Sequence, residues 1–182
     1  MKMGLMATAL VTVIAVAFTI GFYQGQLLAV QQEVKYPHMV NFVVKRDGEV
    51  IYNYTIHNIL TATGAKHARN VYGFNNETLI QVKYISLSND TSPSATWTIL
   101  PNELTGGLAR ATGTPSVVNG TAFQVVASWT SDQTAVIRCT GLHYNATSLS
   151  DNNLWAVATI PDASVISGDD IQVTWTINTP YG

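Results

Sequence analysis

The sequence predicts an all-β protein, an antiparallel β-sandwich of about seven or eight strands that follows one long hydrophobic N-terminal helix. Three observations predict it. Apolar and polar residues alternate with a period of two in several segments after residue 38. Clusters of Gly, Asn, Asp, Ser and Pro separate these segments. An uncharged apolar stretch covers residues 4–23. The expected sandwich is Ig-like or jelly-roll-like.

The first predicted unit, residues 1–32, is the hydrophobic helix. Residues 4–23 match the hydrocarbon core of a bilayer, which is about 30 Å thick. Three interpretations stay open: a retained transmembrane anchor, a cleaved secretory signal, and a pilin-type helix buried in a filament core. Lys2 weakly favours a cytoplasmic N-terminus. We therefore expect a membrane-anchored protein with an extracytoplasmic β domain, in contact with lipid or a filament core through residues 4–23.

Residues 33–38 form a predicted linker, and residues 39–182 the β domain. Its first element is a hairpin, in which alternating segments at 40–45 and 50–56 flank Asp47-Gly48. This dipeptide suits a tight turn that needs positive φ angles. A short helix is expected within residues 57–75, with Thr61 or Thr63 as its N-cap. Gly64 weakens that helix prediction.

The later segments are predicted to form strands near residues 79–87, 108–114, 121–130, 135–139, 154–160 and 171–178. Segment 108–114 is a candidate edge strand. Trp129 and Trp175 fall on apolar faces and are expected in the core, as is Cys139. Trp155 is the best candidate for an exposed or interfacial aromatic ring.

Catalytic, metal-binding and cofactor-binding motifs are missing from the sequence. The chain has no nucleophile elbow and no phosphate-binding glycine loop. Its four histidines lack ligand spacing, and Glu103 stands alone. Asp162, Asp169 and Asp170 lie near one another and could form a calcium loop, but Asp169-Asp170 after Gly168 is expected to be a solvated turn before the last strand. We expect no enzyme, no cofactor and no metal. A carbohydrate hydrolase stays as the enzymatic alternative, because paired carboxylates leave no local signature.

Composition excludes other classes of function. The net charge of −2 gives no electrostatic footprint for nucleic acid, and a single Cys excludes an intrachain disulfide framework. Charged residues make up only 11% of the chain. Strands that are rich in Thr and poor in charge repel one another little, so their edges suit pairing with further chains. The expected partners are copies of the same protein.

Five N-x-[ST] sequons suggest N-glycosylation, although chance occurrence in a Thr-rich chain is the alternative interpretation. The candidate acceptors are Asn53, Asn76, Asn89, Asn119 and Asn145.

Three segments carry a resemblance to a known group. They are HNILTATGAKHARNVYGFNN, YISLSNDTSPSATWTILPNELTGGLARATGT and AVIRCTGLHYNATSLSDNNLWAVATIPDASVISGDDIQVTWTI. In order and spacing they resemble small β-sandwich structural proteins of tailed phages and of archaeal viruses or proviruses. The segment VIAVAFTIGFYQGQ is similar to the N-terminal helix of archaeal pilins, which carry an Ig-like domain. The first resemblance implies a virion- or surface-associated structural protein without enzymatic activity.

We therefore expect a non-enzymatic, membrane-anchored, self-assembling structural subunit of a virion or cell surface. Two alternatives remain. One is a pilin-like subunit whose N-terminal helices bundle in the core of an extracellular filament. The other is an adhesin or receptor-binding domain.

Overall fold

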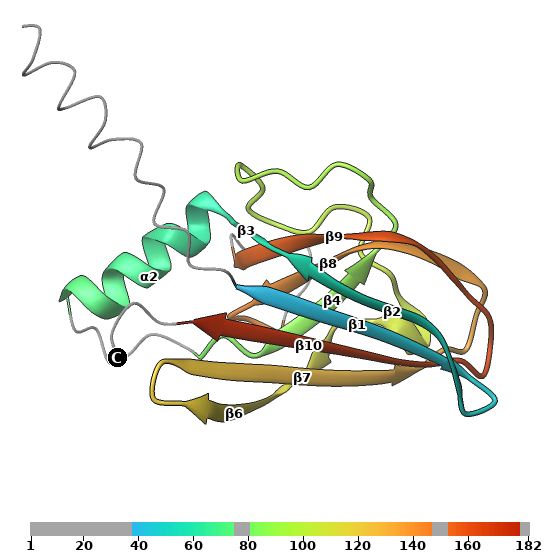
Figure 1. Cartoon of the computed structure of the whole chain (residues 1–182). Coiled ribbons are helices and arrows are strands. Elements are labelled where there is room, and N and C mark those ends of the chain that lie inside the picture. Colours follow the sequence, from blue (N-terminus) through green and yellow to red (C-terminus); the bar gives the residue numbers. More distant parts are fainter. Residues whose placement is uncertain (1–37, 75–80, 147–152, 179–182) are drawn as a thin grey trace, which may run out of the picture. The chain divides into compact units, whose positions relative to one another are not determined.

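The computed structural model describes residues 38–74, 81–146 and 153–178. These residues form two five-stranded antiparallel sheets (Figure 1). In spatial order, sheet A consists of β2 (Glu49–His57), β1 (Met39–Arg46), β10 (Asp170–Asn178), β7 (Ala122–Thr130) and β6 (Thr114–Asn119). Sheet B consists of β3 (Ile59–Leu60), β9 (Leu154–Val165), β8 (Ala135–His143), β4 (Tyr84–Ser88) and β5 (Ala111–Thr112).

The all-β, sandwich-like prediction is confirmed, but the described residues contain ten strands rather than seven or eight. The candidate strand at 108–114 contains β5 and only the first residue of β6, and neither β6 nor β3 was predicted. Gly113 and Pro115 explain the error, because they interrupt the alternation. Gly113 is required there: a Cβ at this position would lie 2.5 Å from Cγ1 of Val125.

The predicted N-terminal helix needs correction. In the part of the chain that the structure describes, the one α-helix has 13 residues, and no helix is long and apolar enough to span a membrane. This finding overturns the fold-class prediction of a long hydrophobic helix, and the membrane-anchored, extracytoplasmic location that rested on it. Residues 1–37 lie outside the described residues.

The first hairpin forms as predicted. β1 pairs with β2, and the turn between them places Asp47 at φ 52° and Gly48 at φ 84°. Positive φ at both positions is the requirement of a type I′ turn, which matches the twist of the two strands.

The helix α2 (Ala62–Phe74) begins at the predicted N-cap. The Thr61 hydroxyl accepts a hydrogen bond of 3.0 Å from the backbone N–H of Gly64. Gly64 has a packing role that the sequence analysis did not foresee, because a Cβ there would collide with the backbone carbonyl of Trp155 in β9. The helix therefore starts directly against sheet B.

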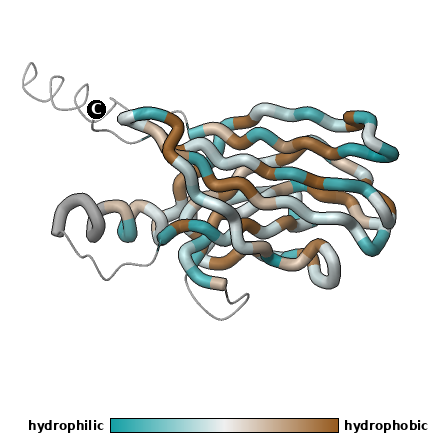
Figure 2. Tube along the Cα trace, turned by 90° about the horizontal axis from the view of Figure 1, so that it is seen from below, coloured by the Kyte–Doolittle hydropathy of each residue, from teal (hydrophilic) through white to brown (hydrophobic). Residues whose placement is uncertain are grey.

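The core lies between the two sheets and follows from the alternation of the strands, visible as alternating brown and teal segments in Figure 2. Phe42 and Trp175 are fully buried, and Trp129 is 7% exposed. A second, smaller cluster lies on sheet B and contains Leu100, Cys139, Leu154 and Val157. Trp97 packs against it. The segment between β4 and β5 therefore covers part of sheet B.

Candidate functional site

A chain of polar side chains runs through the covered side of sheet B. Ser86 comes from β4 and His143 from the end of β8. Asn153 precedes β9, while Arg110 and Glu103 come from the segment between β4 and β5. None of these five residues was chosen as a site residue from the sequence, because they are far apart in the chain and match no motif.

The geometry at His143 is that of a nucleophile, a base and an orienting group. Nδ1 of His143 lies 2.8 Å from Oδ1 of Asn153, and Nε2 lies 2.7 Å from Oγ of Ser86. Arg110 donates to the same Asn153 oxygen at 3.3 Å, which identifies that atom as an acceptor. His143 therefore carries its proton on Nδ1, and Nε2 accepts from the Ser86 hydroxyl. The same order of nucleophile, base and orienting group occurs in Ser–His–Asp and Cys–His–Asn hydrolytic sites.

The electrostatics keep this histidine neutral. Burial is the main cause that lowers the pKa of His143 to about 3, and the positive charge of Arg110 lowers it further. The Arg110 charge is itself compensated, because Nη2 lies 2.7 Å from Oε2 of Glu103. Both side chains of that pair are 5% exposed. Glu103, which the sequence analysis described as isolated, is therefore half of a buried ion pair.

The side chains at the centre of this cluster are buried within the part of the chain that the structure describes. Ser86 and His143 are 0% exposed, and Asn153 is 1% exposed. The space beside Gly141 is occupied, since a Cβ there would lie 2.7 Å from Nε2 of His143 and 2.9 Å from Cδ1 of Leu154. A nucleophilic serine needs space for a carbonyl carbon and an oxyanion. The cluster instead links the segment between β4 and β5 to sheet B.

The other candidates from the sequence do not converge. Asp162 pairs with Arg138 at 3.1 Å, and Asp170 accepts a hydrogen bond of 2.8 Å from the Thr130 hydroxyl. Asp169 is 1% exposed, so the prediction that it lies in a solvated turn is wrong. Within residues 38–74, 81–146 and 153–178 there is no group of three or more His, Cys, Asp or Glu that could hold a metal ion.

Trp155 also departs from its prediction. It was the best candidate for an exposed ring, but it is 7% exposed and packs in the main core. The reason is that β9 is covered on both sides near its start: Leu154, Trp155, Ala156 and Val157 are all buried.

The predicted glycosylation acceptors differ in accessibility. Asn53, Asn89 and Asn119 are exposed. Asn145 is half-buried, and its carbonyl oxygen accepts a hydrogen bond from Arg110. Asn76 lies outside the described residues. Glycosylation stays a prediction at these positions.

The outer face of sheet A carries mostly polar side chains in cross-strand rows. One row joins Asn53, Val43, Gln172 and Ser128. The next joins Thr55, Asn41, Thr174, Val126 and Thr114. A third joins His57, Met39, Thr176, Gln124 and Ser116. Asp and Glu are missing from these three rows, as are Lys and Arg.

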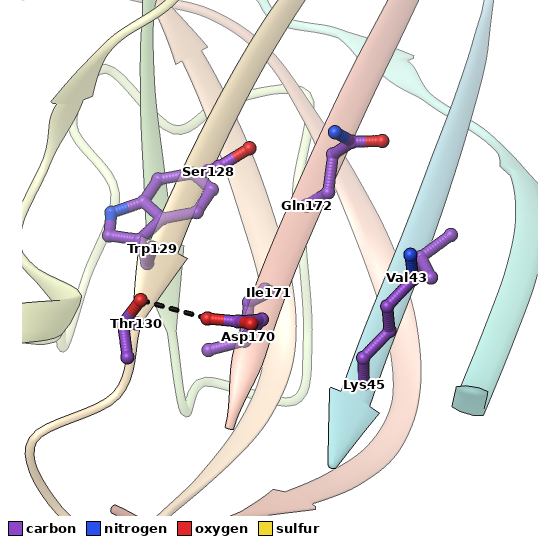
Figure 3. A pocket seen from close by; sticks show the side chains of 8 residues that line it. All are labelled: Val43, Lys45, Ser128, Trp129, Thr130, Asp170, Ile171 and Gln172. Atoms are coloured by element: carbon purple, nitrogen blue, oxygen red, sulfur yellow. Dashed lines mark hydrogen bonds between the residues drawn. The ribbon is translucent and has the colours of Figure 1, made fainter. Parts of the chain in front are cut away.

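Charges enter this face only at one end, in the row of Lys45, Asp170 and Thr130. There the face is hollowed by a volume of about 330 Å³ (Figure 3). Lys45 comes from β1, Asp170 and Gln172 from β10, and Ser128 from β7. These side chains present an ammonium, a carboxylate, an amide and a hydroxyl to one shallow space.

The edge of sheet A beyond this face is β6, which is exposed along all six of its residues. Its side chains include Val117, 82% exposed, and Val118, 49% exposed.

Comparison with protein-family models, with curated proteins and with solved structures gives no match to this chain.

Proposed function

We propose that this protein is a non-enzymatic structural subunit that assembles with copies of itself, as in a virion component of the kind that the resemblance implies. The observation that carries the proposal is the surface of sheet A, where three cross-strand rows and the whole of β6 lack acidic and basic side chains. Copies that meet through such a surface experience little like-charge repulsion and bury few charges.

The burial of the cluster around Ser86 and His143 supports the proposal that the protein is not an enzyme. Ser86 and His143 have the relative position of a nucleophile and its base, yet neither is exposed. A fluorophosphonate probe is therefore expected to leave Ser86 unmodified in the folded protein, as judged by mass spectrometry. Stoichiometric labelling of Ser86, absent after His143→Gln, would contradict the proposal and indicate a serine hydrolase.

Self-association is tested on the full chain by sedimentation velocity over a range of concentrations. Wild type is expected to associate, and a variant with Gln172→Lys and Thr55→Lys to associate less, because both changes place charge on the outer face of sheet A. Thr159→Lys with Ser164→Lys is the matched control, since both residues are exposed on β9 in sheet B. A monomeric wild type, or equal association of the two double variants, contradicts the proposal.

The hollow in Figure 3 favours one alternative, an adhesin or receptor-binding module. Its volume lies at the lower end of the range for ligand sites, roughly 300–1,000 Å³. Lys45, Asp170 and Gln172 offer the hydrogen-bonding groups that a sugar hydroxyl requires. A glycan array tests this alternative. Binding that Asp170→Ala abolishes would support a binding module, and the lack of any binding would contradict it.

A further inference from the structure

We infer that the hollow on the outer face of sheet A binds one sugar unit that carries a carboxylate, a hexuronic acid. This inference rests on the alternative of a binding module, for which it names the class of ligand, and it does not depend on self-association. The hollow has a volume of about 330 Å³ and belongs to β1, β10 and β7 (Figure 3). Each of these strands is paired on both sides, so the floor of the hollow is held by the interior of the sheet.

Two cross-strand rows frame the hollow. One row joins Val43, Gln172 and Ser128, and the other joins Lys45, Asp170 and Thr130. Neighbouring strands lie about 4.8 Å apart, and residues two positions apart on one strand lie about 7 Å apart. Two rows across three strands therefore frame an area of about 10 Å by 7 Å. This is the scale of a single pyranose ring with its substituents, and it is too small for a folded partner.

Lys45 and Asp170 face the hollow with charges that do not neutralise each other. They are directly opposed in the register of β1 and β10, yet none of the ion pairs among the described residues includes either of them. Figure 3 shows that the Lys45 side chain runs along β1 towards Val43 instead of across to Asp170. The ammonium and the carboxylate therefore stand on different sides of the hollow, where one ligand can contact both.

The carboxylate of Asp170 is held in place for an acceptor role. Its Oδ1 accepts a hydrogen bond of 2.8 Å from the Thr130 hydroxyl, and its Oδ2 remains as an acceptor for a ligand hydroxyl. Gln172 adds an amide that both donates and accepts, and Ser128 adds a hydroxyl. A sugar ring matches this set, because each of its hydroxyls both donates and accepts a hydrogen bond.

Lys45 decides the charge of the ligand. A hydrogen bond from its ammonium to a carboxylate is about twice as strong as one to a neutral hydroxyl. Asp170 in the same hollow repels a second negative charge, which disfavours a phosphate dianion. Val43 and Ile171 also line the hollow and offer apolar surface to the C–H face of a ring. A ring with one carboxylate and several hydroxyls satisfies all of these groups.

Ligand-observed saturation-transfer NMR on the full chain tests the site with three probes: methyl glucuronide, methyl glucoside and acetate. The two glycosides differ only in the carboxylate, and acetate carries the carboxylate without the ring. We expect methyl glucuronide to bind weakly, since the hollow is shallow, and methyl glucoside to bind about tenfold more weakly still. Acetate is expected not to compete with methyl glucuronide at equal concentration. Equal affinity for the two glycosides, or equal affinity for acetate, overturns the inference.

Two variants assign the contacts. Lys45→Gln is expected to lower the affinity for methyl glucuronide about tenfold, to the level of methyl glucoside, and to leave binding of the glucoside unchanged. Asp170→Asn is expected to weaken binding of both glycosides. Lys66→Gln, on α2, and Asp132→Asn, between β7 and β8, are the matched controls, because they remove exposed charges outside the hollow.

The folding of these variants is checked by thermal unfolding. Lys45 and Asp170 are exposed, so both variants should melt as wild type does. Unchanged binding of methyl glucuronide by Lys45→Gln, or a lack of binding by the wild-type chain, overturns the sugar site. Sedimentation of the same protein without sugar measures self-association separately. A chain that associates but binds no sugar therefore refutes this inference alone, and a monomer that binds methyl glucuronide refutes only the role as a self-assembling subunit.

Discussion

Arg46 and Asp169 form a two-point ion pair between residues 123 positions apart. Nε and Nη2 of the guanidinium each lie 2.8 Å from a carboxylate oxygen of Asp169. The same carboxylate accepts a hydrogen bond of 2.9 Å from the N–H of Ile166. Asp169 is 1% exposed, so the pair ties the end of the first hairpin to the turn between β9 and β10.

The ion pair between Arg46 and Asp169 makes the stability of the fold depend on pH in the acidic range. The hydrogen bonds from Arg46 hold the pKa of Asp169 below its ordinary value. The contribution of Asp169 is therefore complete above the unfolded pKa of about 3.9 and is lost as the pH falls through the lower folded pKa. Arg46→Gln is expected to lower the midpoint of urea unfolding at pH 7 and to reduce the loss below pH 4. Arg138→Gln is the control, because Arg138 and Asp162 are 32% and 67% exposed and should contribute little.

His143 gives rise to a second dependence of stability on pH, because it is buried in its neutral form. Its pKa of about 3 lies below the unfolded value near 6.5, so the unfolded chain binds one more proton between these pH values. Stability is complete above about pH 6.5 and falls by roughly 1.4 kcal/mol per pH unit toward pH 3. His38 and His67, whose pKa values burial also lowers, add to the same slope.

His143→Gln tests this contribution. The variant is expected to be less stable than wild type at pH 7, because it disturbs the contacts with Ser86 and Asn153, but to show a shallower slope between pH 6.5 and 4. Thr55→Gln, at an exposed position in β2 that carries no titratable group, should keep the wild-type slope. Identical slopes for His143→Gln and wild type would show that His143 does not stay neutral in the folded protein.

The buried ion pair between Glu103 and Arg110 predicts a large loss of stability. Glu103→Gln keeps the shape of the side chain but removes the carboxylate that pairs with Arg110, at a position that is 5% exposed. The expected cost is about 3–5 kcal/mol, or roughly 6–20 °C in the thermal midpoint. Glu49→Gln, at an exposed position, should change the midpoint by about 1 °C or less. A small effect of Glu103→Gln would contradict the importance of this buried ion pair for stability.

The first hairpin allows a clean test of backbone strain. A Cβ at Gly48 meets no atom within 4 Å, so the cost of Gly48→Val comes only from φ 84°, and is expected to be about 1–2 kcal/mol. Gly120 also has open space around it but does not need a left-handed φ. Gly120→Val should therefore be tolerated, and calorimetry of the two variants separates backbone strain from packing. Equal melting temperatures would refute the turn assignment.

Gly64 allows a test of how closely α2 packs against β9. In an isolated helix Gly64→Ala would be favourable by roughly 1 kcal/mol. Here the new Cβ collides with the carbonyl of Trp155, which belongs to the backbone of β9 and cannot rotate away. Gly64→Ala is expected to lower stability, whereas Lys66→Ala, at an exposed position of α2, should be neutral or slightly favourable by circular dichroism melts. A stabilised Gly64→Ala would contradict the docking of α2.

Local chemistry made several elements predictable. Period-two alternation identified β1, β2, β7 and β10, because a strand with one buried face must alternate. Asp47-Gly48 identified a turn that needs positive φ, and Thr61 identified a helix start that needs a side-chain acceptor. Each of these signals depends on neighbours within a few residues.

The predictions that were wrong all concern features that depend on residues far apart in the sequence. The alternation gave no sign of β6, because Gly113 and Pro115 hide a strand that only its pairing with β7 defines. Trp155 and Asp169 were expected at the surface, but distant segments cover them. The burial of Trp155 follows from the packing around β9, and the burial of Asp169 from a partner in the first hairpin.

Composition and periodicity are properties of the linear chain, and they were enough to predict an antiparallel all-β domain that is poor in charge and has no catalytic motif. Which polar groups meet in space became known from the folded protein. These groups are Ser86, His143, Asn153, Arg110 and Glu103, which come together because the segment between β4 and β5 folds over sheet B. Such convergence depends on long-range packing, for which a linear sequence without a motif carries no local signal.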